Sequence, residues 1–400
     1  MVSYETILSK SKEIEPQIAD FLSRLIKCRS HSGTERDVVQ LIKTEMEKLK
    51  YDQVRIDDLG SIIGRIGSGP RIIAIDAHID TVYEGNLENW DKEPYSGEID
   101  DTYVYGRGTS DQKSGLASMV YAGWLMKEFD LLNDFTVLIT GTVMEEDCDG
   151  IAWEHLILED GIKPELVIST EPTSCNIYRG HRGRMEISIE VKGVSCHGSA
   201  PERGDNAIYK MSRIALEIEK LNERLKYDDF LGKGTITVSV MKSDSPSQCA
   251  VSDYVYLQCD RRLTDGETKE IAVNELKECC RLAGYPEAVV KVLKYNEKAY
   301  TGKIYPVEKY YPTWVLSEAS KYLKVAKKGF SSIFNIEPLV DKWTFSTNCV
   351  FIMGKHPEIK CLGFGPGDED QAHAPNEKVK RDDLWKATAF YTSYIKTLKE

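Results

Sequence analysis

Imidazole and carboxylate side chains follow several separate apolar runs of this chain, at the point where each run ends. Four of these runs are predicted to be strands, at 71–80, 135–144, 166–170 and 360–364. Because ligands bind outside the carboxyl ends of the strands in open α/β sheets, we expect the polar residues there to meet at one sheet edge. These residues are His78, Asp80, Glu145, Glu146, Glu171 and His373.

This combination of side chains suits metal ions. Burying two imidazoles and several carboxylates together is costly unless a cation neutralises them. Nitrogen and oxygen donors without thiolate suit divalent zinc, with cobalt or manganese as alternatives. Asp111, in the glycine-bearing loop 106–115, adds a further carboxylate. Two metals about 3.5–4 Å apart that share one carboxylate are typical of co-catalytic hydrolases. Five ligands drawn from these imidazoles and carboxylates would suit such a pair of metals.

Each of these residues also has an ordinary structural explanation. A histidine at a strand end is more often structural than a ligand, a Glu-Glu pair is usually a solvated turn, and an aspartate before a helix is usually an N-cap. Taken together these explanations are less satisfactory, because four different strands deliver carboxylate or imidazole groups to the same edge. The sequence therefore predicts a dinuclear metal site.

The elements that must position this site indicate an α/β fold. Runs that are apolar on both faces suit a sheet covered by helices, and helices are predicted at 114–128 and 312–323. An amphipathic helix is also expected near the start, with apolar residues at helical spacing over 18–26. We therefore expect a three-layer α/β/α catalytic domain.

A different pattern begins near residue 184, where polar and apolar residues alternate. The order strand, helix, strand, strand, helix, strand is that of a split-βαβ unit, so we expect an inserted ferredoxin-like α+β domain. The predicted boundaries are 1–181 for the first part of the catalytic domain, 182–297 for the insertion, and 298–400 for the second part.

Composition excludes several classes of function. The chain has 400 residues, 52 basic against 64 acidic, and a formal charge of −12, which argues against binding to nucleic acid or an anionic membrane. Its apolar stretches fall short of the roughly 20 residues that a membrane span needs. The 10 cysteines form no C-x-x-C pair, which suggests reduced thiols in a cytoplasm. Signatures of phosphate-binding loops and serine hydrolases are missing.

The motifs, in this order, resemble those of the M20 metallopeptidases, the group of succinyl-diaminopimelate desuccinylase, acetylornithine deacetylase, aminoacylase-1 and glutamate carboxypeptidase. The matching segments are His78-Ile79-Asp80, Gly108-Thr109-Ser110-Asp111-Gln112-Lys113, Glu145-Glu146, Glu171-Pro172 and His373-Ala374-Pro375-Asn376-Glu377. The resemblance covers nearly the whole chain. It implies the same three-layer fold and an inserted lid and dimerisation domain.

The resemblance also implies a role for each residue. His78 and Glu171 would bind one metal, Glu146 and His373 the other, and Asp111 would bridge them. Asp80 would accept the second N–H of the His78 imidazole and fix its tautomer. Glu145 would be the general base that removes a proton from water and delivers it to the leaving amine.

Further roles are implied around the insertion. His197, in the segment 193–201, would donate to the oxyanion of the tetrahedral intermediate, either from the same chain or from a partner subunit. Arg262 would clamp a substrate carboxylate, with Arg261 pointing to the opposite face. His181 and Asn348 stand where relatives line the substrate pocket, and both depart from the desuccinylase pattern. The segments around Cys249 and around Asn348 resemble those of a subgroup of selenium-metabolism-linked hydrolases.

The predicted function is therefore a dinuclear, zinc-dependent amidohydrolase that cleaves an N-acyl amino acid or a related small carboxylate-bearing amide. A dipeptidase or carboxypeptidase of the same superfamily is an alternative, as is a catalytically silent metal-binding scaffold. A homodimer through the lid is also expected, because the alternating strand 184–192 is predicted at a sheet edge. The expected partners are a small amide or dipeptide substrate and a second copy of the chain.

Overall fold

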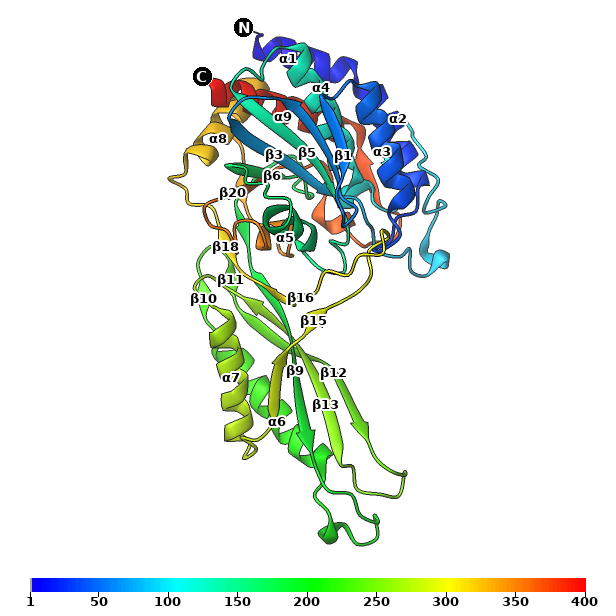
Figure 1. Cartoon of the computed structure of the whole chain (residues 1–400), viewed down its shortest axis with the longest axis vertical. Coiled ribbons are helices and arrows are strands. Elements are labelled where there is room, and N and C mark those ends of the chain that lie inside the picture. Colours follow the sequence, from blue (N-terminus) through cyan, green and yellow to red (C-terminus); the bar gives the residue numbers. More distant parts are fainter. Residues whose placement is uncertain (1) are drawn as a thin grey trace.

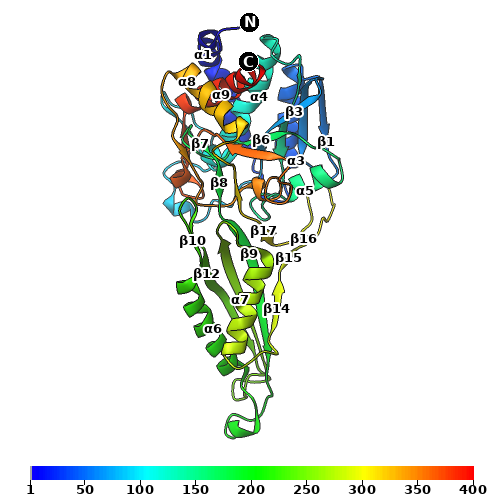
Figure 2. The ribbon, with the colours of Figure 1, turned by 90° about the vertical axis from the view of Figure 1, so that its left-hand side faces the viewer.

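The protein, described by a computed structural model over residues 2–400, has a large and a small unit (Figure 1). The large unit contains both chain ends. The small unit, residues 183–292, extends away from it as an elongated sheet with two helices (Figure 2). Two separate hydrophobic cores accompany this division, since the buried apolar residues of the small unit form a cluster of their own.

The large unit is built on an eight-stranded mixed sheet in the order β1-β2-β5-β3-β6-β20-β7-β19. Its central strands pair in parallel and are buried on both faces, as their apolar sequences predict. The antiparallel hairpin β1-β2 closes one edge. The strand bounds are β1 (Gln53–Ile56), β2 (Ile62–Gly67), β3 (Arg71–His78), β5 (Phe135–Thr142), β6 (Leu166–Ser169), β7 (Ile177–Tyr178), β19 (Val340–Asp341) and β20 (Lys360–Gly363).

Helices cover this sheet on both faces. Figure 1 shows α4 and α9 behind the sheet and the short helix α5 in front of it. The helices are α1 (Tyr4–Glu13), α2 (Glu15–Lys27), α3 (Arg36–Lys48), α4 (Ser114–Glu128), α5 (Ile151–Leu158), α8 (Lys321–Phe334) and α9 (Arg381–Lys399). The mixed α/β fold predicted from the sequence is confirmed.

One predicted helix is wrong in its bounds. The segment predicted as a helix over 312–323 instead contains the short strand β18 (Trp314–Val315), and α8 begins only at Lys321. The reason is pairing and capping: β18 pairs with β8 (Gly180–His181), and the Ser320 side chain caps α8 by accepting from the Tyr322 amide.

The small unit has the element order expected for it. Its sheet order is β12-β13-β9-β14, all antiparallel, with α6 and α7 packed on one face. The elements are β9 (Gly183–Lys192), α6 (Ala207–Arg224), β12 (Thr235–Asp244), β13 (Tyr254–Leu263), α7 (Lys269–Leu282) and β14 (Val289–Val292). The prediction that 184–192 is an edge strand is wrong: β9 lies between β13 and β14, because its alternating residues are buried on the helix side and paired on both edges.

The chain enters the small unit through β8 and returns to the large unit directly after β14, where Tyr295, Ala299 and Val307 join the large hydrophobic core. Further along, β18 pairs with β8 in antiparallel fashion. Close to them, β17 (Tyr310–Tyr311) pairs with the start of β9. The remaining short pairs are β4 (Tyr103–Tyr105) with β21 (Lys378–Lys380), β10 (Tyr227–Asp228) with β11 (Gly232–Lys233), and β15 (Lys294–Tyr295) with β16 (Val307–Glu308).

Two further sequence expectations concern membranes and thiols. Among residues 2–400, no helix combines the length and the apolarity needed to cross a membrane. All 10 cysteines are unpaired.

Candidate metal centre

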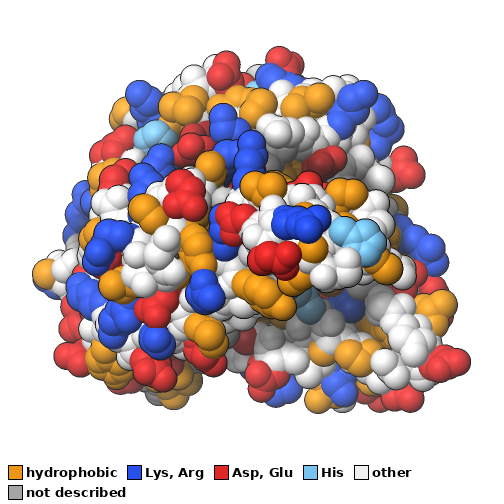
Figure 3. All heavy atoms as spheres, turned by 90° about the horizontal axis from the view of Figure 1, so that it is seen from below, with side chains coloured by type: hydrophobic (Ala, Val, Ile, Leu, Met, Phe, Trp, Pro, Cys, Tyr) orange, Lys and Arg blue, Asp and Glu red, His pale blue; other side chains and the backbone are white. Residues whose placement is uncertain are grey.

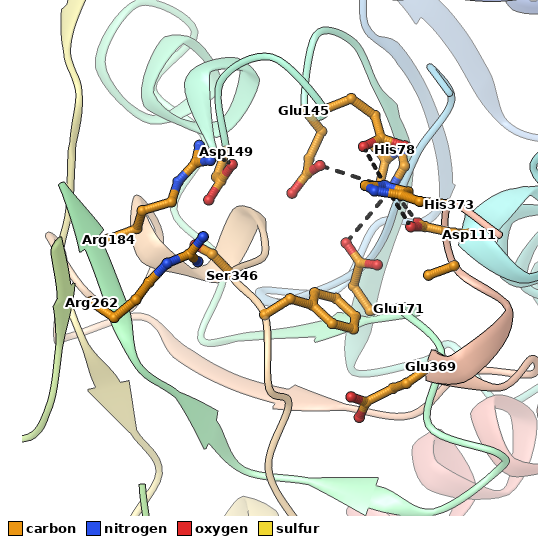
Figure 4. A pocket seen from close by; sticks show the side chains of 13 residues that line it. His78, Asp111, Glu145, Asp149, Glu171, Arg184, Arg262, Ser346, Glu369 and His373 are labelled. Carbon is orange, nitrogen blue, oxygen red and sulfur yellow. Dashed lines mark hydrogen bonds and ion pairs between the residues drawn. The ribbon is translucent and has the colours of Figure 1, made fainter. Parts of the chain in front are cut away.

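The predicted ligands converge just past the ends of β3, β5 and β6 (Figure 4). The His78 Nε2 atom lies 2.9 Å from Asp111 Oδ1 and 3.8 Å from Glu171 Oε1. On the other side, His373 Nε2 lies 2.9 Å from Glu146 Oε2 and 3.4 Å from Asp111 Oδ2. The two oxygens of Asp111 therefore face two different imidazoles, as expected for a carboxylate shared between two metal ions.

Two sets of side chains have donor atoms close enough for one ion each. His78, Glu145 and Glu171 form one set, and His78, Asp111 and Glu146 form the other, with all donor atoms within 4.8 Å of one another. Glu145 Oε2, at 3.9 Å from His78 Nε2, is thus near enough to be a ligand, although the sequence suggested only a general base. His373 belongs to neither set, but it contacts Glu146 and Asp111 directly.

The electrostatics of the cluster fit a cation. Burial raises the pKa of Glu145 and of Glu171 well above the usual range, and it raises the pKa of Glu146 to about 7. The Oε1 atom of Glu145 is buried and has no hydrogen-bond partner among residues 2–400. A bound divalent ion stabilises closely spaced buried carboxylates, and it would also provide a partner for the Glu145 Oε1 atom. The residues present therefore fit a metal centre.

The histidines and Asp111 stabilise one another. Hydrogen bonds to Asp111 and Glu146 raise the pKa of His373 to about 10. Burial opposes the charge of His78, yet the neighbouring Glu145 and Glu171 raise its pKa. Burial also acts against the ionised form of Asp111, but hydrogen bonds from the two histidines lower its pKa below the usual range. Asp111 is therefore held as a carboxylate.

Asp80 lies behind this cluster and acts differently from what we expected. The backbone carbonyl of Asp80, at 2.9 Å, accepts the His78 Nδ1–H, while the carboxylate Oδ1 lies 3.5 Å away. The carboxylate instead accepts the backbone N–H groups of Glu145 and Glu146, at 3.1 and 3.0 Å. The Ser32 hydroxyl adds a 2.6 Å bond. Asp80 thus fixes the backbone that carries the base and a ligand.

Two buried glutamates that sequence reasoning missed support the same loops. Glu35 Oε1 accepts the Met144 amide at 3.1 Å, and Met144 has a φ of 63°, a left-handed conformation that non-glycine residues rarely adopt. Glu377 accepts the amides of Ser110 and Asp111 at 2.7 and 3.0 Å. Glu377 is part of the motif that begins at His373, which is the only signal that could have identified it. Nothing in the sequence around Glu35 marks it.

A cavity of about 350 Å³ lies beside the cluster and reaches the small unit. Arg262 lines it, as predicted, together with Arg184, its paired residue on β9. Arg184 Nη2 bonds to Asp149 Oδ1 at 2.9 Å. Arg261 points to the opposite face of the sheet, where it bonds to Glu267 at 2.6 Å. Sequence reasoning missed Arg184 and Asp149, because neither belongs to a motif.

Two expected pocket residues lie outside the cavity lining. His181 is fully buried at the crossing between the units, where its Nε2 accepts from the Trp314 indole at 2.7 Å. Burial lowers the pKa of His181 to about 4. Asn348 is also buried: its amide donates to Asp76 at 2.9 Å and accepts from Gly150. Both side chains satisfy buried polar groups, so this structure does not support direct contact with substrate.

His197 is likewise remote from its own chain's cavity. It is exposed in the loop after β9, where its Nδ1 bonds to the Ser199 hydroxyl at 2.7 Å. Arg184 stands at the near end of β9 and His197 beyond the far end, and a strand rises by about 3.3 Å per residue. The loop therefore lies about 25 Å or more along the small unit from the arginine pair.

A histidine and carboxylate cluster of this kind at the edge of an α/β sheet is typical of metal-dependent hydrolases. The sequence agrees: residues 74–397 match the model of peptidase family M20/M25/M40, and the chain belongs to this family. It is 50% identical over 392 residues to the uncharacterized protein YgeY of Escherichia coli K12, covering 98% of this chain and 97% of that protein.

Solved structures agree with this fold. Aminopeptidase PepT from Bacillus cereus aligns with a TM-score of 0.73 at 19% identity, covering 96% of this chain and 99% of that one. The Bacillus subtilis YXEP protein, described as a dinuclear metal binding peptidase of family M20, aligns with a TM-score of 0.69 at 13% identity, covering 96% and 98%. At these identities the likeness concerns the fold.

Proposed function

We propose that this protein is a dinuclear metal-dependent amidohydrolase that cleaves a small amide bearing a carboxylate. The observation that carries this proposal is Asp111, whose two oxygens face His78 and His373 while Glu145 lies beside them. Arg262 lines the same cavity and supplies a group that suits a carboxylate. The proposed ligands are His78 and Glu171 for one ion, Glu146 and His373 for the other, and Asp111 for both.

We assign the general base to Glu145. Two divalent cations, with zinc the first choice and cobalt or manganese as alternatives, would lower the pKa of water and polarise the scissile carbonyl. Glu145 has a buried oxygen without a partner, and its amide is fixed by Asp80. The Glu145 carboxylate accepts a proton from the attacking water and returns it to the leaving amine. Arg262 holds the substrate carboxylate in the cavity meanwhile.

The test combines metal analysis with turnover. The purified chain should bind two divalent ions, and with zinc, cobalt or manganese it should hydrolyse members of a panel of N-acyl amino acids and dipeptides. Glu145→Gln should keep the metal and lose turnover. A chain that binds no metal and shows no metal-induced thermal shift contradicts the proposal. Metal binding without turnover of any panel member favours the catalytically silent scaffold.

We further propose a homodimer through the small unit. The edge strand β12 is largely exposed and presents unpaired backbone groups, which a second copy can pair with. Figure 3 shows hydrophobic, acidic and basic side chains interspersed over the molecule as seen from this end. In such a dimer the remote His197 would serve the partner's cavity. Light scattering should give twice the chain mass, and a monomer would refute the trans role of His197.

A further inference from the structure

Four charged residues of the cavity wall belong neither to the predicted ligands nor to the base. Figure 4 shows that the basic ones gather at one end of the cavity, with Asp149 beside them. Glu369 lies away from that end, below Glu171. The cavity is therefore polarised, with cations at the small-unit end and an acid at the other. The four residues are Asp149, Arg184, Arg262 and Glu369.

At the basic end, positive charge remains available to a ligand. The Arg184 guanidinium is paired with Asp149 inside the protein, at 2.9 Å. Arg262 is paired with Asp260 at 2.8 Å, but both side chains are about one-third exposed, and an exposed pair of this kind is weak. Arg262 therefore keeps a guanidinium edge that can bind a carboxylate.

At the other end of the cavity lies Glu369, whose carboxylate has neutral hydrogen-bond partners. It begins the short 3-10 helix η5 (Glu369–Gln371), and its Oε2 accepts from the Thr344 hydroxyl at 3.1 Å. Its other partners are the Thr344 amide and the Tyr178 hydroxyl, so among residues 2–400 only neutral groups pair with it. The side chain is half-buried, and this burial raises its pKa. A cation bound against Glu369 would remove the cost of that burial.

We propose that Glu369 binds a protonated amine of the substrate, so that the substrate is a small amide with a carboxylate on one side of the scissile bond and an ammonium group on the other. This inference rests on the proposed hydrolase function and makes Glu369 a specificity-determining residue. The distribution of charge supports it: Arg262 suits the carboxylate end and Glu369 the ammonium end of one cavity of about 350 Å³. Aminoacyl amino acids have this charge pattern, whereas acetyl amino acids lack the ammonium group.

The discrimination should be strong, because a site built for a charged group rejects an analogue that lacks it. An acetyl substrate would leave the half-buried Glu369 without a positively charged partner, and hydrogen bonds to charged groups contribute more than those between neutral groups. Glycyl-L-alanine and acetyl-L-alanine form a matched pair, since they differ only by the ammonium group on the acyl side.

The experiment measures kcat/KM for both compounds with the metal-loaded protein. We expect glycyl-L-alanine to be preferred at least about tenfold, the ratio given by 1.4 kcal/mol. Glu369→Gln should abolish this preference by slowing glycyl-L-alanine alone. Asp370→Asn, a change at the exposed neighbour, is the matched control and should leave the ratio unchanged. A preference for acetyl-L-alanine, or an unchanged ratio in Glu369→Gln, overturns the inference while the hydrolase function stands.

A binding measurement separates the inference from catalysis. Calorimetry with the metal-loaded Glu145→Gln variant should show at least about tenfold tighter binding of glycyl-L-alanine than of acetyl-L-alanine. The double variant with Glu369→Gln should bind the two equally. If the wild type turns over neither compound but this difference in binding is present, the hydrolase proposal fails and the ammonium site stands. Equal binding in the single variant overturns the ammonium site.

Discussion

The edge of the large sheet and the face of the small sheet hold their charged residues in place in different ways. At the large edge, the ligands stand at the last residue of a strand or in irregular backbone, and buried carboxylates such as Asp80 and Glu377 bind the amides of these loops. On the small sheet, Arg184 and Arg262 stand within regular strands, opposite each other in the β9–β13 ladder. The first arrangement depends on a few buried anchors, whereas the second depends on strand register.

This difference implies different responses to mutation. Removing an anchor of the large edge should disturb chemistry and metal binding together, since each anchor serves several loop residues. Changes in the small unit should alter substrate binding or local stability and leave the metal centre intact.

The largest effect is expected at the base. Glu145→Gln should lower kcat by about a thousandfold, within the range of general acid–base catalysis, because the amide cannot take a proton from water. Bound metal, measured by elemental analysis, should stay at the wild-type level. Glu202→Gln, at an exposed glutamate of the small unit, is the control and should behave as wild type. Full activity in Glu145→Gln would show that another group is the base.

Removing an anchor of the large edge should cost stability. Glu377→Ala leaves Arg107 buried without its 2.7 Å partner and frees the amides around Asp111. We expect the free energy of unfolding to fall by about 3 kcal/mol or more, as for other broken buried pairs. Urea denaturation measures this loss, with Glu358→Ala at an exposed site as control. An effect no greater than that of the control would mean that the loop is held by other contacts.

The crossing between the units should be sensitive to acid. His181 has a pKa of about 4 when folded, because burial disfavours its charged form, whereas a histidine in the unfolded chain has an ordinary pKa of about 6.5. The unfolded chain therefore binds the extra proton first, and stability present above pH 6.5 is lost as the pH falls towards 4. The difference corresponds to about 3 kcal/mol.

Denaturation at several pH values measures this loss. His181→Gln should show a smaller loss between pH 6.5 and 4 than the wild type, and His197→Gln, at an exposed histidine, should match the wild type. Parallel curves for His181→Gln and the wild type would contradict the assignment.

Next in size is the effect on substrate binding in the small unit. Arg262→Ala should raise KM by about tenfold to a hundredfold for carboxylate-bearing substrates, the equivalent of a lost hydrogen bond to a charged group. The metal content should be unchanged, because Arg262 contacts none of the ligands. Arg262→Lys should recover only part of the affinity, since lysine lacks the bidentate geometry. Loss of metal in Arg262→Ala would contradict the prediction that changes in the small unit leave the metal centre intact.

The smallest effect is expected in the core of the small unit. Ile187 is fully buried in its separate hydrophobic cluster, so Ile187→Val should cost about 1 kcal/mol of stability. Thermal unfolding measures this change, and metal affinity measured on the same sample should equal that of the wild type. A change in metal affinity would mean that the two cores are coupled.

The same comparison explains what the sequence could predict. The meeting of His78, Glu145 and Glu171 was predictable, because parallel strands bring their carboxyl ends to one edge whatever the details of the loops. The order of elements in the small unit was predictable from alternation and helical spacing. Both signals are local and periodic.

The other residues of the site are held by contacts between segments that are distant in the sequence. Glu35 and Glu377 bind amides more than 100 residues and more than 200 residues away along the chain, and no local pattern reports such bonds. His181 and Asn348 were expected in the pocket from their positions in motifs, but position does not fix the direction of a side chain. Arg184 was missed because an arginine in an alternating strand is usually solvated.

Because β8 and β18 are neighbours, the small unit is inserted between two adjacent points of the large unit. Antiparallel partners stand about 5 Å apart, so the end of β8 and the start of β18 can be joined by a short turn in place of the whole small unit. In such a deletion the large unit keeps both termini and all the candidate ligands, but with the two arginines it also loses Tyr295, Ala299, Val307 and Tyr311 of its own hydrophobic core. The small unit is therefore topologically an insertion, and a shortened chain that replaces these four core residues would carry the same metal centre with an open cavity.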